Sequence, residues 1–510
     1  MNKQNASLLE DDGPEQDETA TARPRLHLTG APMLRGTRYF LREKRWFFIA
    51  LVVGALLYFL PTPEGLGRDG QTVLVMAAVA VILFVTEPVP LPTVALMIVA
   101  GEVLLLGIDS SDAAKSLMND SVLFIMGSLM LAVAVVKQKL DKRIAYVIVR
   151  FTGTKTVNVC FGISLASGVM ASVIGEHTVA AMMLPVALTL VTLTSDDAKA
   201  VRPLAAVLLF SISYGCSIAG IGTPSGGARN AIMVGYWREF FFDPGNVETR
   251  KYLVDYVTWM KYAYPVFLVQ LPLVTVLLFA AFRPKQSHIT RAVVKLRNQI
   301  EAVGPMKSRD WVAIGVFLFT LIGWITLSDK LGLGIVALMG AVLFLILGLV
   351  RWNDINTGVN WGVVLLYAAT ISLGVQMQAT GAAAWVATSF LELLRPLGVD
   401  GGVPLWLSVT ALTTAVTNTM SAGAAVAVLG PIMLKTAVLT GDSPLIIGFL
   451  TAISSSFAYF TPAAHPAFTI IYAAGYLKAR DFVRVGWRIA IMSCAVLIAA
   501  AYFYWPLLGT

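Results

Sequence analysis

The chain has 510 residues, of which 57% are hydrophobic and only 13% are charged, and its mean hydropathy is +0.74. Soluble proteins carry about 25% charged residues and a single apolar core stops growing at roughly 250–300 residues, so this composition excludes a soluble protein and predicts a polytopic membrane protein. The net charge of +8 does not indicate nucleic-acid binding, because the basic residues gather between apolar stretches, where they orient a membrane protein.

The N-terminal segment, residues 1–45, is polar and contains an acidic run followed by a basic run. It holds too few apolar residues to form a core, so we expect it to be disordered. It does not resemble a signal peptide, because no apolar segment with a cleavage site follows a short basic start. We expect this segment to be cytoplasmic, with its basic part against the anionic membrane surface.

Nine apolar stretches are long enough to cross a bilayer as single helices, at a rise of about 1.5 Å per residue. They lie near residues 46–61, 71–87, 92–108, 121–136, 258–282, 310–327, 331–349, 361–379 and 482–505.

Four further apolar stretches are interrupted by polar residues. Residues 157–193 and 403–438 are predicted to be re-entrant hairpins, and residues 203–236 and 443–476 are predicted to be helices broken in their middle. Broken backbone at membrane depth is tolerated only where protein or a water-filled cavity satisfies its polar groups. One hairpin and one broken helix in each half of the chain are typical of a secondary transporter built from inverted repeats.

The predicted halves are residues 46–282 and 310–510, joined by a cytoplasmic linker at residues 283–309. Lys and Arg gather in this linker, in residues 137–155 and in residues 478–488. By the positive-inside rule, this pattern places the N-terminus in the cytoplasm and the C-terminus outside, provided that both hairpins are re-entrant. We expect the protein to lie in the plasma (inner) membrane.

Ionisable residues at the tip of the first hairpin are candidates for binding and coupling. A protonated His177 would bring a positive charge to a bound anion, and Thr178 adds a hydroxyl. Glu176 could pair with His177 or carry a transported proton, so both are candidates for coupling. The alternative is a structural Glu–His pair that caps the tip, although ionisable residues within a membrane are costly.

The first broken helix contains a glycine pair and an arginine. Gly226 and Gly227 allow backbone carbonyls to approach an ion and backbone amides to face an anion. Arg229, at the start of the second half-helix, could bind a carboxylate through two parallel hydrogen bonds. Alternatively, it neutralises Glu176 or reaches a water-filled cavity.

The second half offers a similar set of groups. Thr417, Asn418 and Thr419 form the tip of its hairpin, where an amide and two hydroxyls can serve a cation or a carboxylate, although Thr and Asn also cap helices. In the second broken helix, Ala464 allows close approach to the backbone, and His465 would make the site more cationic. A core histidine that donates to a backbone carbonyl is the alternative for His465.

Several motifs occur in a fixed order along the chain. They are TEPVPL at residues 86–91, Asn360-Trp361-Gly362 followed by Leu373-Gly374, and GYLK at residues 475–478 followed by Asp481-Phe482. With them, the chain resembles the divalent anion/sodium symporter family of the ion transporter superfamily, from about residue 46 onwards. The tip at residues 417–419 matches the family's Ser-Asn-Thr hairpin signature with one change, and Gly226 and Asn230 fit its broken-helix signature.

The resemblance implies a homodimer in which each protomer has a scaffold part and a transport part that slides as an elevator. It implies dicarboxylates, tricarboxylates or sulfate as substrates, bound with sodium between the hairpins and the broken helices. One implied sodium position falls on Thr413, Val416, Asn418 and Ala463. The other falls on Ser172 and Gly226, and it is weakened because His177 replaces the family's Asn and imidazole is a poor sodium ligand.

We therefore expect a secondary active transporter of small organic or inorganic anions, dicarboxylates above all, driven by sodium coupling or by anion exchange. Proton coupling through Glu176 and His177 is an alternative, and an anion channel is a further one. An enzyme is not expected, because the chain lacks an HExxH zinc motif and a Ser–His nucleophile pair on matched spans. The expected partners are a small anion, the lipid bilayer and a second copy of the chain. No cofactor is expected, and sodium is the candidate coupling ion.

Overall fold

The computed structural model describes residues 44–138, 153–195, 197–301, 306–462 and 464–509. Packing divides the chain into two units, Met1–Arg45 and Trp46–Thr510, and the second holds the long apolar helices. The predictions for most of the N-terminal segment, for most of the basic loop at residues 137–155 and for Ala463 lie outside the described residues.

The described chain is helical, and its only β-type pairing is an isolated bridge between Lys155 and His288. The longer helices are α2 (Arg45–Phe59), α3 (Arg68–Thr86), α4 (Leu91–Leu106), α6 (Asp120–Lys137), α8 (Thr156–Ile174), α9 (Glu176–Thr194), α10 (Ala198–Ala219), α11 (Ala228–Phe241), α12 (Tyr256–Phe282), α14 (Ser308–Thr326), α16 (Leu333–Ile346), α18 (Trp361–Ala379), α20 (Gly402–Thr417), α21 (Ala422–Thr440), α22 (Pro444–Ser454) and α24 (Ala479–Ala499). The other helices are α5 (Ser110–Leu117), α13 (Thr290–Glu301), α15 (Ser328–Leu331), α17 (Trp352–Gly358), α19 (Ala382–Leu394), α23 (Pro466–Ala473), η1 (Pro224–Gly226), η2 (Val247–Tyr252), η3 (Arg395–Leu397), η4 (Ala500–Tyr504) and η5 (Trp505–Leu508).

Ten helices in the described part are long and apolar enough to cross a membrane, or up to eleven if a bent pair counts as one span. The bent pair joins Ala382–Leu397 to Gly402–Thr417 at an angle of 118°. Each apolar stretch predicted to be helical contains a helix. The prediction of an all-helical, polytopic membrane protein is therefore confirmed.

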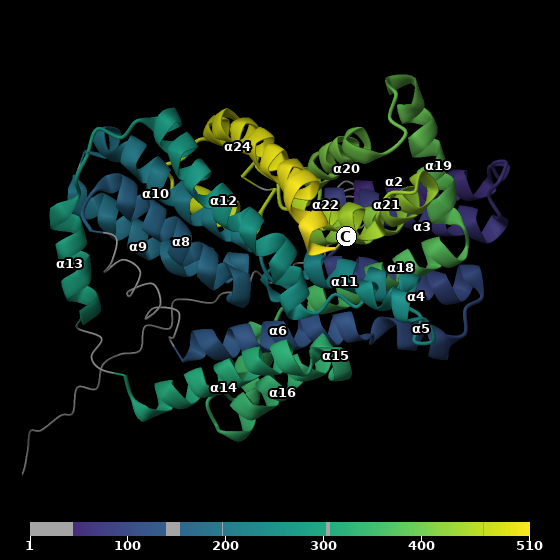
Figure 1. The fold of residues 1–510 in the computed structure, drawn as a ribbon, viewed down its shortest axis with the longest axis horizontal. Helices are drawn as coiled ribbons and strands as arrows, with labels where there is room; N and C mark the ends of the chain where they lie inside the picture. The colour runs from purple at the N-terminus through teal and green to yellow at the C-terminus, as the bar shows by residue number, and fades with distance from the viewer. Residues whose placement is uncertain (1–43, 139–152, 196, 302–305, 463, 510) are drawn as a thin grey trace, which may run out of the picture. The chain divides into compact units, whose positions relative to one another are not determined.

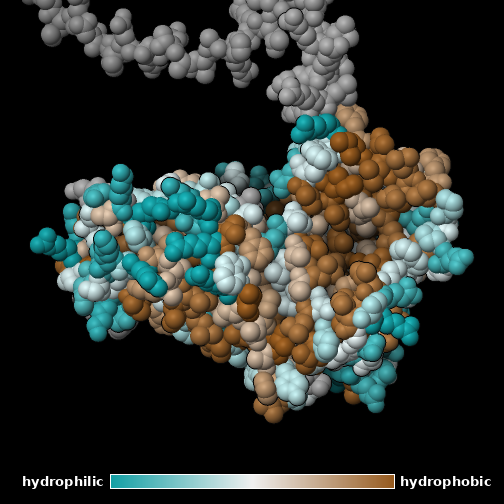
Figure 2. Space-filling model, turned by 90° about the horizontal axis from the view of Figure 1, so that it is seen from above, coloured by the Kyte–Doolittle hydropathy of each residue, from teal (hydrophilic) through white to brown (hydrophobic). Residues whose placement is uncertain are grey.

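Apolar side chains cover much of the face shown in Figure 2. Phe59, Leu104 and Ile346 are 82%, 80% and 74% exposed. A soluble monomer rarely exposes so large a continuous apolar area. Lipid is the solvent that such a surface requires.

The four interrupted stretches are broken at different kinds of residue. Only Gly175, with φ of +99°, separates α8 from α9, a backbone angle that residues with a side chain rarely adopt. α20 and α21 are separated by residues 418–421, and α10 and α11 are separated by a loop that contains η1. α22 ends at Ser454 and α23 begins at Pro466, and the described residues between them form turns and irregular backbone.

The two halves pack against each other in a reciprocal way. α10 packs on α8 and α9 (Figure 1), and α22 packs on α20 and α21. The second half-helices cross over, because α11 packs on α21 and α23 packs on α9. A hydrogen bond of 3.0 Å from the Ser217 hydroxyl to the Ser456 carbonyl joins the two broken helices directly. This packing gathers the breaks into one region.

Candidate functional site

A cavity of about 170 Å³ lies where the breaks meet. Both hairpins, both broken helices and the unbroken helices α6 and α18 contribute to its wall. The polar or backbone-exposing part of the lining is Ser128, Gly175, Glu176, His177, Ser225, Gly226, Gly227, Arg229, Tyr367, Ser421, Gly423, Ala464 and His465.

Four helices begin at this cavity. The starts of α9, α11 and α21 line it through Glu176, Ala228 and Ala422, and the start of α23 lines it through Pro466. The N-terminus of a helix carries unpaired N–H groups and a partial positive charge, so it favours anions. Four such ends around one cavity make it suited to a negatively charged ligand.

The two halves differ in how these helix starts are capped. In the second half, the Ser421 hydroxyl accepts from the Ala424 N–H at 3.3 Å, and His465 Nδ1 accepts from the Ala467 N–H at 3.2 Å. In the first half, glycine precedes each helix and no side chain caps it. Within the described residues, no hydrogen bond uses the backbone N–H of His177 or Arg229. The free donors therefore lie mainly on the side of the first half.

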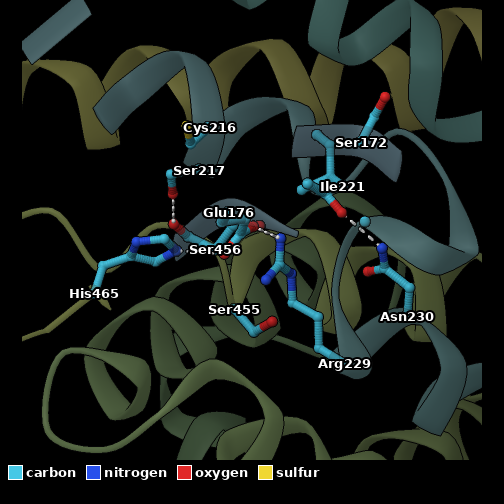
Figure 3. Close-up of polar contacts among 12 residues, drawn as sticks. Ser172, Glu176, Cys216, Ser217, Ile221, Arg229, Asn230, Ser455, Ser456 and His465 are labelled. Carbon is cyan, nitrogen blue, oxygen red and sulfur yellow. Dashed lines mark hydrogen bonds and ion pairs between the residues drawn. The ribbon is translucent and has the colours of Figure 1, made fainter. Parts of the chain in front are cut away.

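A buried ion pair and a histidine dominate the polar lining (Figure 3). Arg229 Nη2 lies 2.6 Å from Glu176 Oε1, and His465 Nε2 lies 2.5 Å from Glu176 Oε2. The side chains of Arg229, Glu176 and His465 are only 3%, 11% and 3% exposed. Glu176 on the first hairpin therefore joins both broken helices.

Both ring nitrogens of His465 have partners. Its Nδ1 accepts from the backbone N–H of Ala467 at 3.2 Å, and its Nε2 lies 2.5 Å from Glu176 Oε2. The histidine therefore joins the start of α23 to the tip of the first hairpin. That His465 makes the site more cationic stays a prediction.

Arg229 retains hydrogen-bonding capacity. Its guanidinium packs over Gly220 and Gly227, whose missing side chains leave room for it. Only Nη2 bonds to Glu176, and the buried Nε has no partner among the described residues. An unpaired buried donor is costly, and a guanidinium can bind a carboxylate through two parallel bonds. The arginine is thus held in place with a donor to spare.

Of the other binding residues predicted in the first half, some line the cavity and some do not. His177, Gly226 and Gly227 line the cavity, and His177 is exposed. Thr178 does not line it. Ser172 lies just outside, with its carbonyl oxygen accepting hydrogen bonds from the hydroxyls of two residues in the break.

The second hairpin tip bonds to the broken helix instead of lining the cavity. Thr417 donates to the Ser455 carbonyl at 2.6 Å. The Asn418 amide donates to the Phe457 carbonyl at 3.2 Å and accepts from the Phe460 N–H at 3.1 Å. The nitrogen and the oxygen of the amide therefore both have protein partners, and these bonds fasten the irregular segment after α22.

Two of the oxygens implied at the second sodium position are already bonded within the protein. The Val416 carbonyl accepts from Thr419, both from its N–H at 2.9 Å and from its hydroxyl at 2.7 Å, and the Asn418 amide oxygen accepts from the Phe460 N–H. The Thr413 hydroxyl is buried without a hydrogen-bond partner among the described residues. Hard cations prefer hydroxyl, carbonyl and amide oxygens. Thr413, Val416 and Asn418 therefore stay predicted sodium ligands.

Replacing Asn418 with alanine is expected to lower the free energy of unfolding by about 1–3 kcal/mol, because it leaves buried backbone groups without partners. Melting of the purified protein in detergent measures this. The neighbouring Thr419→Ala is the control, because Thr419 is exposed and surface substitutions usually change stability by less than about 0.5 kcal/mol. Equal melting temperatures for the two variants would contradict a fastening role for Asn418.

Sequence reasoning did not select three residues that shape the site. Asn230 donates to the carbonyls of Gly220 and Thr223 at 2.8 and 2.7 Å and so closes the first break. Its fit to the family's broken-helix signature was the one available signal. Tyr367 and Ser421 also line the cavity. An aromatic residue in an unbroken helix and a serine before a helix are too common to mark a site.

The helical fold and its apolar spans define a polytopic membrane protein. A family model described as "Sodium:sulfate symporter transmembrane region" matches residues 42–510. The chain belongs to this family, which confirms the predicted membership of the divalent anion/sodium symporters. It is a transporter and not an enzyme, as predicted.

Similar proteins agree with this assignment. The chain is 22% identical over 490 residues to the sodium-dependent dicarboxylate transporter SdcS of Staphylococcus aureus, covering 90% of this chain and 91% of that one. It is 23% identical over 493 residues to SdcS of Staphylococcus saprophyticus, with the same coverage of 90% and 91%.

Two solved structures share the fold. They are the YdaH transporter of Alcanivorax borkumensis, with a TM-score of 0.51, 15% identity and coverage of 93% and 98%, and MtrF of Neisseria gonorrhoeae, with a TM-score of 0.54, 14% identity and coverage of 94% and 96%.

Proposed function

We propose that this protein is a secondary active transporter that carries small anions, dicarboxylates above all, through the cavity at the four breaks. The observation that carries the proposal is the convergence of four helix N-termini on the cavity that Arg229 lines, and the buried Nε of Arg229 has no partner among the described residues. These groups offer fixed donors to an oxyanion without bulk water. The similarity to sodium-dependent dicarboxylate transporters supports the same substrate class.

The size of the cavity supports a small substrate. Sites for drug-sized ligands enclose about 300–1,000 Å³, whereas this cavity encloses about 170 Å³. One carboxylate of the cargo would lie between the uncapped starts of α9 and α11, next to Arg229. The exposed His177 and the hydroxyl of Ser421 would face the remainder of the molecule.

The proposed mechanism is an elevator motion. The halves at residues 46–282 and 310–510 are proposed to be inverted repeats joined by the linker at residues 283–309, with α8–α9 and α20–α21 as re-entrant hairpins. The reciprocal packing of the broken helices on the hairpins supports a transport part that moves as one body. The scaffold would form a homodimer, with the N-terminus cytoplasmic and the C-terminus outside.

We propose that anion transport is driven either by coupling to a sodium gradient or by exchange for another anion. The relatives named sodium-dependent and the buried hydroxyl of Thr413 favour sodium at the second position. Proton transfer by Glu176 is less favoured, because both of its oxygens accept hydrogen bonds from Arg229 and His465. A protonated carboxyl has only one oxygen that remains a good acceptor.

Ligand-induced stabilisation and transport in proteoliposomes test this function. A dicarboxylate is expected to raise the melting temperature of the purified protein, because it binds only the folded state. Internal anion is expected to accelerate uptake of labelled external anion, as a carrier requires. Flux that is insensitive to internal anion and proportional to concentration would identify a channel, and the absence of stabilisation by dicarboxylates, citrate, sulfate and sulfonates would contradict the proposal.

A further inference from the structure

Arg229 brings a positive charge next to the position where the family resemblance implies a first sodium ion. That position falls on Ser172 and Gly226. Gly226 packs against Gly220, and Arg229 Nη2 lies only 2.8 Å from the point where a Cβ at Gly220 would stand. Like charges repel strongly at short range where water is excluded. These residues therefore do not fit a sodium ion at the first position.

The site supplies its own counter-charge for this arginine. Glu176 and Arg229 form a buried pair at 2.6 Å, and His465 Nε2 lies 2.5 Å from the other carboxylate oxygen. A buried pair is tolerable when its remaining polar atoms are also bonded. The guanidinium of Arg229 is thus offset by one carboxylate.

We infer that Glu176 is an internal counter-anion for Arg229, and that this pair takes the place of the first sodium ion of the family. The inference rests on the proposed function in that the cargo is an anion. In the empty site the pair is neutral. When cargo arrives, Arg229 binds it through the donors that Glu176 does not use, and the carboxylate keeps the guanidinium in position.

The pair has a consequence for the transport cycle. An unpaired charge in a low-dielectric interior is costly, so a carrier with a lone guanidinium would be held in place until an anion bound. Here Glu176 pairs with the guanidinium when the site is empty, so the empty carrier can cross. The protein can therefore carry out net anion transport, and it requires no sodium ion at the first sodium position.

The decisive experiment asks whether removal of Arg229 creates a sodium site. Arg229→Gln leaves the Glu176 carboxylate without its cation, so sodium is expected to bind there and to raise the melting temperature. The shift from choline chloride to sodium chloride, at equal ionic strength and without anionic cargo, is expected to exceed the wild-type shift by about 2 °C or more. Any effect at the second position is common to both proteins and cancels.

The double variant Glu176→Gln/Arg229→Gln is the control, because it lacks both charges. Its sodium shift is expected to return to the wild-type value. Equal sodium shifts in all three proteins would overturn the inference, as would a larger shift in the wild type than in Arg229→Gln. These melting experiments need no cargo, so their outcome is independent of whether the proposed substrate class is right.

A second variant decides the matter if Arg229→Gln does not fold. Glu176→Gln keeps Arg229 and removes its counter-charge, so the empty carrier is expected to be held while exchange continues. The ratio of anion exchange to net uptake in proteoliposomes is expected to rise at least about tenfold. An unchanged ratio would overturn the inference, whereas an absence of both fluxes in the wild type would count against the proposed function.

Discussion

Replacing Arg229 with glutamine is expected to weaken anion binding by about 100-fold in sodium-free buffer, because truncating one partner of a buried charge pair costs about 2–5 kcal/mol. The anion-induced rise in melting temperature and the uptake of labelled anion measure this effect. The anion affinity of Arg229→Lys is expected to lie between those of the wild type and Arg229→Gln. An ammonium is a point charge and lacks the planar guanidinium that can bond to Glu176 and to a cargo carboxylate together.

Arg202 provides a matched control for this experiment. It lies in α10, the first half of the same broken helix, and its Nη2 bonds to Asp481 at 2.6 Å. It does not line the cavity. Arg202→Gln is therefore expected to lower stability but to leave the affinity for the anion unchanged. A larger loss of affinity in Arg202→Gln than in Arg229→Gln would place the anion elsewhere.

Much of the fold could be predicted because lipid restricts what a chain can do. A membrane-crossing segment must be apolar and must satisfy its own backbone, and both requirements are visible in the sequence. The helix α19 and the 118° bend before α20 were not predicted. An apolar helix of 13 residues is too short to cross a bilayer, and its direction is set by packing on α21, which no local pattern reveals.

The residues of the site could be predicted better than the hydrogen bonds between them. Glu176, Arg229 and His465 stand out because charged or ionisable groups within a membrane are costly. The bond from His465 to Glu176 joins residues 289 positions apart, so no spacing could indicate it. Residues 417–419 show the opposite case. Their pattern marks a break, but only the tertiary structure shows that their polar groups bond to the neighbouring backbone.

Alanine substitutions at Gly220 and Gly226 are expected to have different effects, the first mainly on anion affinity and the second mainly on stability. A Cβ at Gly220 would overlap Glu176 Oε1 and would lie 2.8 Å from Arg229 Nη2. Those are side-chain ends, so the fold can adjust while the ion pair is displaced. Overpacking of this kind costs about 1–3 kcal/mol, and here the cost is expected to appear as a loss of anion affinity of about tenfold or more.

Gly226→Ala is expected to act on folding instead. A Cβ at Gly226 would lie 2.6 Å from the carbonyl oxygen of Gly220, and backbone atoms held by Asn230 cannot move aside as a side chain can. The melting temperature should therefore fall further in Gly226→Ala than in Gly220→Ala. Gly315→Ala is the control, because a Cβ at this position in α14 meets no atom within 4 Å and alanine favours a helix over glycine by about 1 kcal/mol. Wild-type anion affinity in Gly220→Ala would show that the Glu176–Arg229 pair does not shape the binding site.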